Sequence, residues 1–193
     1  MDGRDSLSKL PEREKVGLRQ WLQHQRRDGY WRQGSVAENY RDITCAVYAI
    51  GGWADGYSNA VPRLLEGLQA PAKGLIGPWG HALPHSAYPG PQIGFLQECL
   101  RWWDHWLKGK ETGIMDEPML RAWMEDPIAP SPSYAEKPGH WVAETSWPSA
   151  RIEPQAWSLT PGHLTEGEPA KGEVLKIRSP QATGLASGNW CPY

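Results

Sequence analysis

The chain has 193 residues, a length that fits one ordinary domain or two small ones. Its 20 basic and 22 acidic residues give a net charge of -2 at pH 7, which argues against nucleic acid or an anionic membrane as a partner. The mean hydropathy of -0.61 and the lack of a long apolar run predict a soluble protein without a membrane-spanning helix. The opening residues, MDGRDSLSKLPEREK, contain no apolar core of a secretory signal. A signal could precede this piece of sequence, so the compartment stays open, with the cytoplasm only slightly favoured.

The composition is unusual in its aromatic and turn-forming residues. The chain holds 12 Trp, 21 Gly and 18 Pro, which suits a loop-rich domain with aromatic recognition surfaces. A noncatalytic Trp-rich β-sandwich that binds carbohydrate or protein is therefore an alternative to an enzyme. Three widely spaced cysteines, Cys45, Cys99 and Cys191, predict neither a disulfide framework nor a CxxC metal site, and we expect them to be buried thiols.

The first half of the chain alternates between helical and strand-like patterns. Residues 9–33 place apolar side chains at helical intervals among charges and predict an amphipathic helix that stops at Gly29. Residues 43–52 form a short apolar run closed by two glycines, which indicates a parallel strand buried on both faces. A helix at residues 58–71 and a second apolar strand at residues 72–77 follow.

The pattern then changes toward the C-terminus. A loop rich in Pro and Gly precedes residues 92–107, whose wide apolar helical face predicts a largely buried helix. Strand, helix, strand and helix in this order are typical of an α/β fold with a parallel sheet and crossover helices. Beyond about residue 113, short alternating segments between Pro and Gly turns predict an antiparallel β region.

Two residues suited to proton transfer follow the two predicted parallel strands. Asp55 follows the first strand and His81 the second, at the edge where open α/β sheets bind ligands. Imidazole can take a proton from a serine hydroxyl and return it to a leaving group when a carboxylate fixes its tautomer. We therefore predict that Asp55 orients His81 in a catalytic triad. The plainer alternative is that Asp55 is a turn residue and His81 a solvated loop residue.

Aromatic residues flank both predicted loops. Trp53 and Tyr57 stand beside Asp55 and suit either a substrate-binding pocket or packing on the core. Trp79, two residues before His81, suits packing.

The histidine spacing in the second loop does not predict a metal site. His81 and His85 form an H-x-x-x-H pattern, but Pro84 interrupts it and no Glu lies between them. We therefore expect no metal ion, and no cofactor is implied.

Three stretches of residues 21–107 resemble a known enzyme family. They are WLQHQRRDGYW, GGWADGY and GPWGH, and they resemble the CocE/NonD hydrolases and the related X-prolyl dipeptidyl-peptidases of family S15. In that family the second stretch carries the triad acid and the third the triad histidine, which implies these roles for Asp55 and His81. The resemblance also implies a division into the end of a helical cap at 1–33, the C-terminal part of an α/β-hydrolase domain at 34–113 and the start of an antiparallel β jelly-roll at 114–193.

The family's nucleophile is absent from this sequence. Family members place their serine in a G-x-S-x-G elbow upstream of the acid, and the chain holds no such motif. We therefore expect a serine hydrolase of acyl esters or X-Pro dipeptidyl amides whose serine lies in a missing N-terminal part, so that this chain alone is inactive. Its expected partner is a small-molecule ester or peptide substrate, with no nucleic acid and no membrane.

Overall fold

The computed structural model describes residues 12–167, 174 and 176–183. The chain divides into two compact units, Met1–Ile43 and Thr44–Tyr193. None of the helices in the described part of the chain combines the length and apolarity needed to cross a bilayer.

The described residues of the first unit form two helices and two 3₁₀ turns: α2 (Glu12–Gln23), α3 (Gly29–Arg32), η1 (Val36–Glu38) and η2 (Tyr40–Asp42). The prediction of a single helix that stops at Gly29 is therefore wrong, because α2 ends at Gln23 and Gly29 begins a new helix. Asp28 explains the restart. Its carboxylate accepts a 2.9 Å hydrogen bond from the backbone N–H of Tyr30, which is the bond of a helix N-cap.

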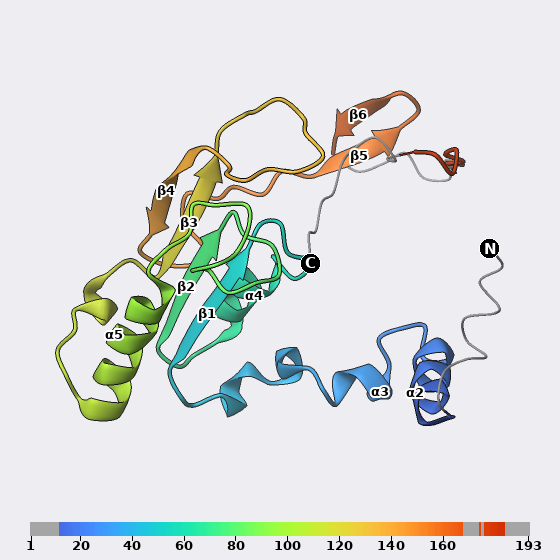
Figure 1. Ribbon diagram of the computed structural model, residues 1–193. Helices are drawn as coiled ribbons and strands as arrows, with labels where there is room; N and C mark the ends of the chain where they lie inside the picture. The colour runs from blue at the N-terminus through green and yellow to red at the C-terminus, as the bar shows by residue number, and fades with distance from the viewer. Residues whose placement is uncertain (1–11, 168–173, 175, 184–193) are drawn as a thin grey trace. The chain divides into compact units, whose positions relative to one another are not determined.

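The second unit is built on a four-stranded sheet (Figure 1). Its strands, in spatial order, are β1 (Val47–Gly52), β2 (Ala72–Gly77), β3 (Leu120–Glu125) and β4 (Gly139–Glu144). The first three are parallel, and β4 runs antiparallel to β3. Helix α4 (Ala60–Gly67) connects β1 to β2, and α5 (Phe95–Lys108) follows the loop after β2. The predicted order of strand, helix, strand and helix is thus confirmed.

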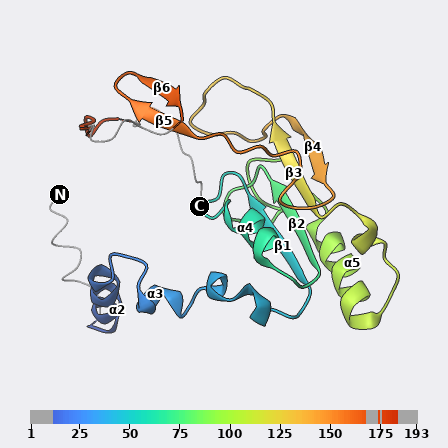
Figure 2. The ribbon, with the colours of Figure 1, turned by 180° about the vertical axis from the view of Figure 1, so that it is seen from behind.

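Each face of this sheet carries a cluster of buried side chains. Successive residues of a strand point to opposite sides, so one strand can contribute to both clusters. The cluster on the side of α4 contains Ala49, Val61, Leu65, Ala72, Ile76, Leu120 and Ala122. Figure 2, the view from behind, shows α4 lying across β1. The cluster on the other side contains Leu75, Trp79 and Ala87, with Tyr48, Ile50 and Ile93 packed against it. Trp79 is 1% exposed, so its predicted packing role is confirmed.

Helix α5 leaves most of its apolar face exposed, so the prediction of a largely buried helix is wrong. Trp102 is the one buried residue of this fully described helix. Its ring centroid lies 5.2 Å from that of Tyr48 on β1. The exposed large side chains of α5 are Leu96, Leu100, Trp103, Trp106 and Leu107.

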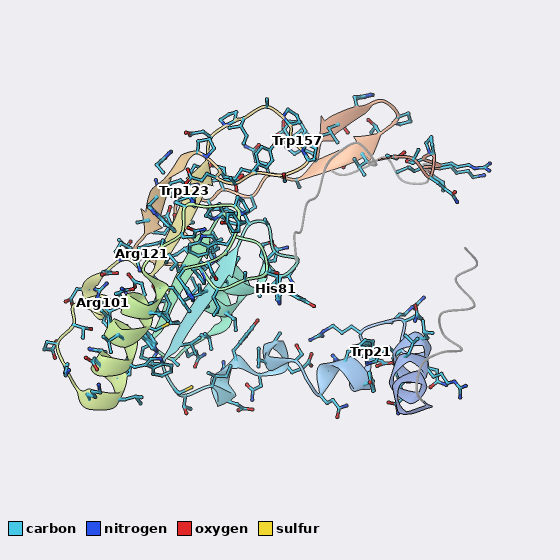
Figure 3. All side chains as sticks on the ribbon, viewed as in Figure 1. Trp21, His81, Arg101, Arg121, Trp123 and Trp157 are labelled. Atoms are coloured by element: carbon cyan, nitrogen blue, oxygen red, sulfur yellow. The ribbon has the colours of Figure 1, made fainter. Side chains whose placement is uncertain are left out.

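A network of polar side chains joins α5 to β1 and β3. Glu98 on α5 accepts hydrogen bonds from the Tyr48 hydroxyl at 3.2 Å and from Arg121 at 3.0 Å. Arg121 also donates to the Tyr48 hydroxyl at 2.7 Å, and Glu117 forms ion pairs with both Arg101 and Arg121 (labelled in Figure 3). Burial raises the pKa of Tyr48 to about 12, so this hydroxyl stays protonated and keeps donating at neutral pH. The network fixes α5 against the sheet.

The pairing of strand β3 places it in a different sheet from the one that the predicted domain boundary implies. The sequence predicts that residues 114–193 open a separate antiparallel region, yet β3 pairs with β2 in parallel. Leu120 and Ala122 supply buried side chains to the cluster under α4, and their pairing satisfies the backbone groups along the second edge of β2. Strands β3 and β4 therefore extend the α/β sheet across the expected boundary at residue 114.

The last described strands, β5 (Trp157–Thr160) and β6 (His163–Glu166), pair as an antiparallel hairpin. Gly162 in its turn has a φ of +80°, the left-handed conformation that favours glycine. A two-stranded hairpin agrees with the antiparallel β region expected here. The jelly-roll itself stays a prediction, because that fold requires two packed sheets.

The cysteines differ from the expectation of buried thiols. Cys45 is exposed and Cys99 is half-buried, while Cys191 lies outside the described residues. Burial, with the charge of Glu98 adding to it, raises the pKa of the Cys99 thiol. The Cys99 thiol therefore lacks the depressed pKa of a reactive nucleophile.

Candidate active site

The acid and the histidine singled out in the sequence lie side by side at the carboxyl edge of the sheet. Asp55 is in the turn after β1. His81, which is labelled in Figure 3, is in the loop after β2. The His81 Nδ1 atom lies 2.8 Å from Asp55 Oδ2. The side chain of Asp55 is 15% exposed and that of His81 is 56% exposed, so a sheltered carboxylate contacts an accessible imidazole. With the Nδ1 proton directed at the carboxylate, Nε2 is the ring atom suited to exchange a proton with a substrate.

The carboxylate of Asp55 is held by its own turn. Its Oδ1 atom accepts a 2.7 Å hydrogen bond from the backbone N–H of Tyr57, while Oδ2 contacts His81. Partial burial raises the pKa of Asp55, but the hydrogen bonds from Tyr57 and His81 and the charge of the imidazole outweigh it and hold the pKa below its ordinary value. Asp55 therefore stays ionised at neutral pH. The sequence left open whether Asp55 is a turn residue or the partner of the imidazole. In the structure its carboxylate does both.

The β1–β2 ladder continues into the two loops and fixes their spacing. The Trp53 backbone N–H donates to the Gly77 carbonyl at 2.9 Å, and the Ala54 N–H donates to the Trp79 carbonyl at 3.0 Å. Gly52 permits this approach, because a Cβ atom there would lie 2.0 Å from the Trp79 carbonyl oxygen. The acid loop and the histidine loop are thus joined through backbone atoms.

We expect Gly52→Ala to destabilise the fold by about 3 kcal/mol, the upper end of the usual cost of overpacking, because the added methyl group meets rigid backbone. Gly51→Ala is the matched control, since its Cβ would meet only a Val61 methyl group, at 3.0 Å. Urea unfolding of both variants measures the difference. Equal stability of the two would show that the histidine loop moves aside at little cost.

The depressed pKa of Asp55 predicts a pH-dependent contribution to stability. A carboxyl group whose pKa is lower in the folded chain stabilises the fold above its ordinary pKa of 3.8, and this stabilisation disappears as the pH falls through the folded value. We expect the stability difference between the wild type and Asp55→Asn to be constant above about pH 5 and to shrink below it. Urea unfolding between pH 3 and 7 tests this. A difference that grows on acidification would contradict it.

The two aromatic residues beside Asp55 lie in different surroundings. Tyr57 is 71% exposed, and its ring centroid lies 6.3 Å from that of His81. Trp53 is 39% exposed, and its Nε1 donates a 2.7 Å hydrogen bond to the Trp123 carbonyl of β3. Tyr57 is therefore placed next to the imidazole, whereas Trp53 is directed toward β3.

A cavity of about 400 Å³ opens beside the acid and the histidine. Asp55 and His81 supply its polar groups, while Ile50, Leu83 and Phe95 supply apolar wall. This volume lies within the range of small-molecule sites. No sequence motif singles out Leu83 and Phe95, which lie in the loop after GPWGH and at the start of α5. Within residues 12–167, 174 and 176–183, no group of three or more His, Cys, Asp or Glu side chains is placed to hold a metal ion.

Comparisons with known proteins point to hydrolases. A family model for X-Pro dipeptidyl-peptidase (S15 family) matches residues 2–83, a range that contains both Asp55 and His81. Two curated proteins with serine esterase in their names, from Mycobacterium bovis and Mycobacterium tuberculosis, are each 29% identical to the chain over 56% of its length. The chain spans 17% of the length of these relatives.

A solved structure supports the fold. The crystal structure of a CocE/NonD family hydrolase from Staphylococcus aureus matches with a TM-score of 0.50 and 13% identity, covering 72% of this chain and 24% of that chain. At 13% identity, this likeness supports the α/β architecture alone. The family match over residues 2–83, the serine esterase relatives and this likeness of fold together support the resemblance of the chain to CocE/NonD-like hydrolases of the S15 family.

Proposed function

We propose that this chain supplies the acid and the histidine of a Ser-His-Asp triad in a serine hydrolase that cleaves acyl esters or X-Pro dipeptidyl amides. The observation that carries the proposal is the 2.8 Å contact between His81 Nδ1 and Asp55 Oδ2 at the carboxyl edge of a parallel sheet. The names of the mycobacterial relatives favour an ester, and the name of the family favours an amide.

Each residue has a defined role in this reaction. His81 takes the proton of the serine hydroxyl as the serine attacks the carbonyl carbon, and then gives that proton to the leaving alcohol or amine. An acyl-enzyme remains, which water hydrolyses with His81 again acting first as base and then as acid. Asp55 remains ionised throughout, because its pKa is depressed, and stabilises the imidazolium that forms in each step.

In this proposal the nucleophile comes from polypeptide outside the 193 residues. The sequence holds no G-x-S-x-G elbow. Among the described strands β1 pairs with β2 alone, so its other edge offers backbone donors and acceptors to a further strand. A parallel strand paired there would end at the same edge of the sheet as Asp55 and His81. The predicted cap at residues 1–33 and a jelly-roll that begins after β4 belong to the same proposal.

The proposal is tested by joining the chain behind the strands and G-x-S-x-G elbow of an S15-family hydrolase. We expect this joined hydrolase to cleave a p-nitrophenyl ester and His81→Ala to abolish the reaction. His105→Ala is the control, because His105 lies on α5, away from the loops that hold the acid and the histidine. Hydrolysis that survives His81→Ala would reject the triad role.

A further inference from the structure

A second and larger cavity adjoins the same two loops. Its volume is about 860 Å³. Trp53 comes from the acid loop, Tyr88 from the histidine loop, and Tyr134 from the connection between β3 and β4. We call it the Trp53–Tyr134 cavity. Ala54, the residue directly before Asp55, is part of its wall, so the cavity begins next to the proposed catalytic acid.

The walls of this cavity are joined to one another by hydrogen bonds. The backbone N–H of Gly90 donates to the Ala135 carbonyl at 2.7 Å, and the Lys137 N–H donates to the Gly90 carbonyl at 3.0 Å. These bonds hold the β3–β4 connection against the histidine loop. On the acid side, Trp53 Nε1 donates to the Trp123 carbonyl at 2.7 Å. The cavity is therefore built into the fold and does not depend on a ligand to assemble it.

The charged groups of the lining neutralise each other. Lys137 Nζ lies 3.2 Å from Glu125 Oε2 and 4.3 Å from the centroid of the Tyr134 ring. A cation paired with a carboxylate and placed over an aromatic ring leaves little net charge to attract an ionic ligand. The cavity therefore favours an uncharged group.

The hydroxyl of Tyr134 is also engaged within the protein. It donates to the Ala129 carbonyl at 2.9 Å and accepts from the Ser131 N–H at 2.7 Å. This pairing fixes the ring in the wall. The three aromatic side chains, Trp53, Tyr88 and Tyr134, then offer faces and edges suited to stacking with another ring.

We propose that the Trp53–Tyr134 cavity binds an uncharged aromatic ring, carried by either the acyl or the leaving group of the substrate. The substrate role rests on the proposed hydrolase function, whereas ring binding is a property of this chain alone. A preformed cavity with aromatic walls beside the acid loop would make the enzyme selective for aryl-bearing esters or amides.

The test measures binding of benzyl alcohol to the 193-residue chain by saturation-transfer NMR, with cyclohexylmethanol as the nonaromatic probe of similar size. We expect benzyl alcohol to bind more tightly. Tyr134→Leu and Tyr88→Leu should each weaken it about 5- to 10-fold, because each removes one aromatic partner. Tyr134→Phe keeps the ring and should keep most of the affinity. Tyr40→Leu, in the first unit, is the unaffected control.

Three results would overturn the proposal: equal binding of the two alcohols, no binding of benzyl alcohol, or a Tyr134→Leu variant that binds it as the wild type does. A second measurement applies if the chain alone does not fold. In the joined hydrolase, the ratio of kcat/KM for benzyl over cyclohexylmethyl acetate should fall about 5- to 10-fold on Tyr134→Leu. Methyl phenylacetate and methyl cyclohexylacetate are the matching pair that carries the ring on the acyl group. A ratio that is unchanged in both pairs rejects the cavity while leaving the triad intact, whereas aryl binding by an inactive joined protein rejects the triad alone.

Discussion

Asp55→Asn in the joined hydrolase is expected to lower kcat for ester hydrolysis by about 10⁴-fold, the loss produced when a triad acid becomes an amide. The carboxylate accepts the proton on His81 Nδ1 and stabilises the positive ring that forms during each proton transfer. An Asn side chain of the same size carries no charge and can donate to Nδ1, which would place the ring proton on Nε2. His81 then faces the serine hydroxyl with a proton in place of a lone pair.

The measurement is kcat on a p-nitrophenyl ester at pH 8, with Asp126→Asn as the matched control. Asp126 is exposed and follows β3 directly, much as Asp55 follows β1, and its backbone N–H donates at 2.9 Å to the Pro138 carbonyl just before β4. We expect the control to keep wild-type kcat. A loss of less than about tenfold for Asp55→Asn would make Asp55 a turn residue only, and it is also the outcome that a noncatalytic Trp-rich sandwich predicts.

The second large effect concerns the chain by itself. We expect the 193-residue chain to hydrolyse the same ester on the order of 10⁶-fold more slowly than the joined hydrolase, because triad residues act as a unit and the nucleophile is absent. The acid and the histidine together can still hold a proton, but no hydroxyl in a G-x-S-x-G elbow is present to attack the carbonyl.

The control for this comparison is the joined hydrolase with its elbow serine replaced by Ala. Its rate should match that of the chain alone, since both lack the same atom. Fast hydrolysis by the chain alone, abolished by His81→Ala, would mean that a residue within these 193 positions acts as the nucleophile. That result would refute our assignment of the serine to another segment.

The sequence predicts the contact between Asp55 and His81 because the signals for it are local. Asp55 and His81 each follow an apolar run closed by glycine, and the carboxyl ends of neighbouring parallel strands meet at one edge. Pairing of β1 with β2 through a short connection containing α4 is the simplest arrangement of those segments. The contact at 2.8 Å then follows from strand geometry together with two short loops.

The errors concern contacts between distant parts of the chain. The alternating pattern of Leu120–Glu125 fits an edge of an α/β sheet as well as a strand of a sandwich, and only its parallel pairing with β2 decides between them. The pattern of α5 revealed an apolar face but not whether this chain covers it. The Trp53–Tyr134 cavity joins residues about 80 positions apart, which no local spacing indicates.

The backbone hydrogen bonds of Trp53 and Ala54 have a consequence for how the distance between acid and histidine is set. Because these bonds tie the two loops to the register of β1 and β2, the length of the α4 connection has no influence on that distance. Insertions at Gln69, an exposed position before β2, would leave the contact in place. A slip of β2 by one residue would carry His81 about 3.3 Å along the strand and separate the pair. Strand register is therefore the quantity that evolution or design must conserve here, while the crossover between the strands is free to vary in length.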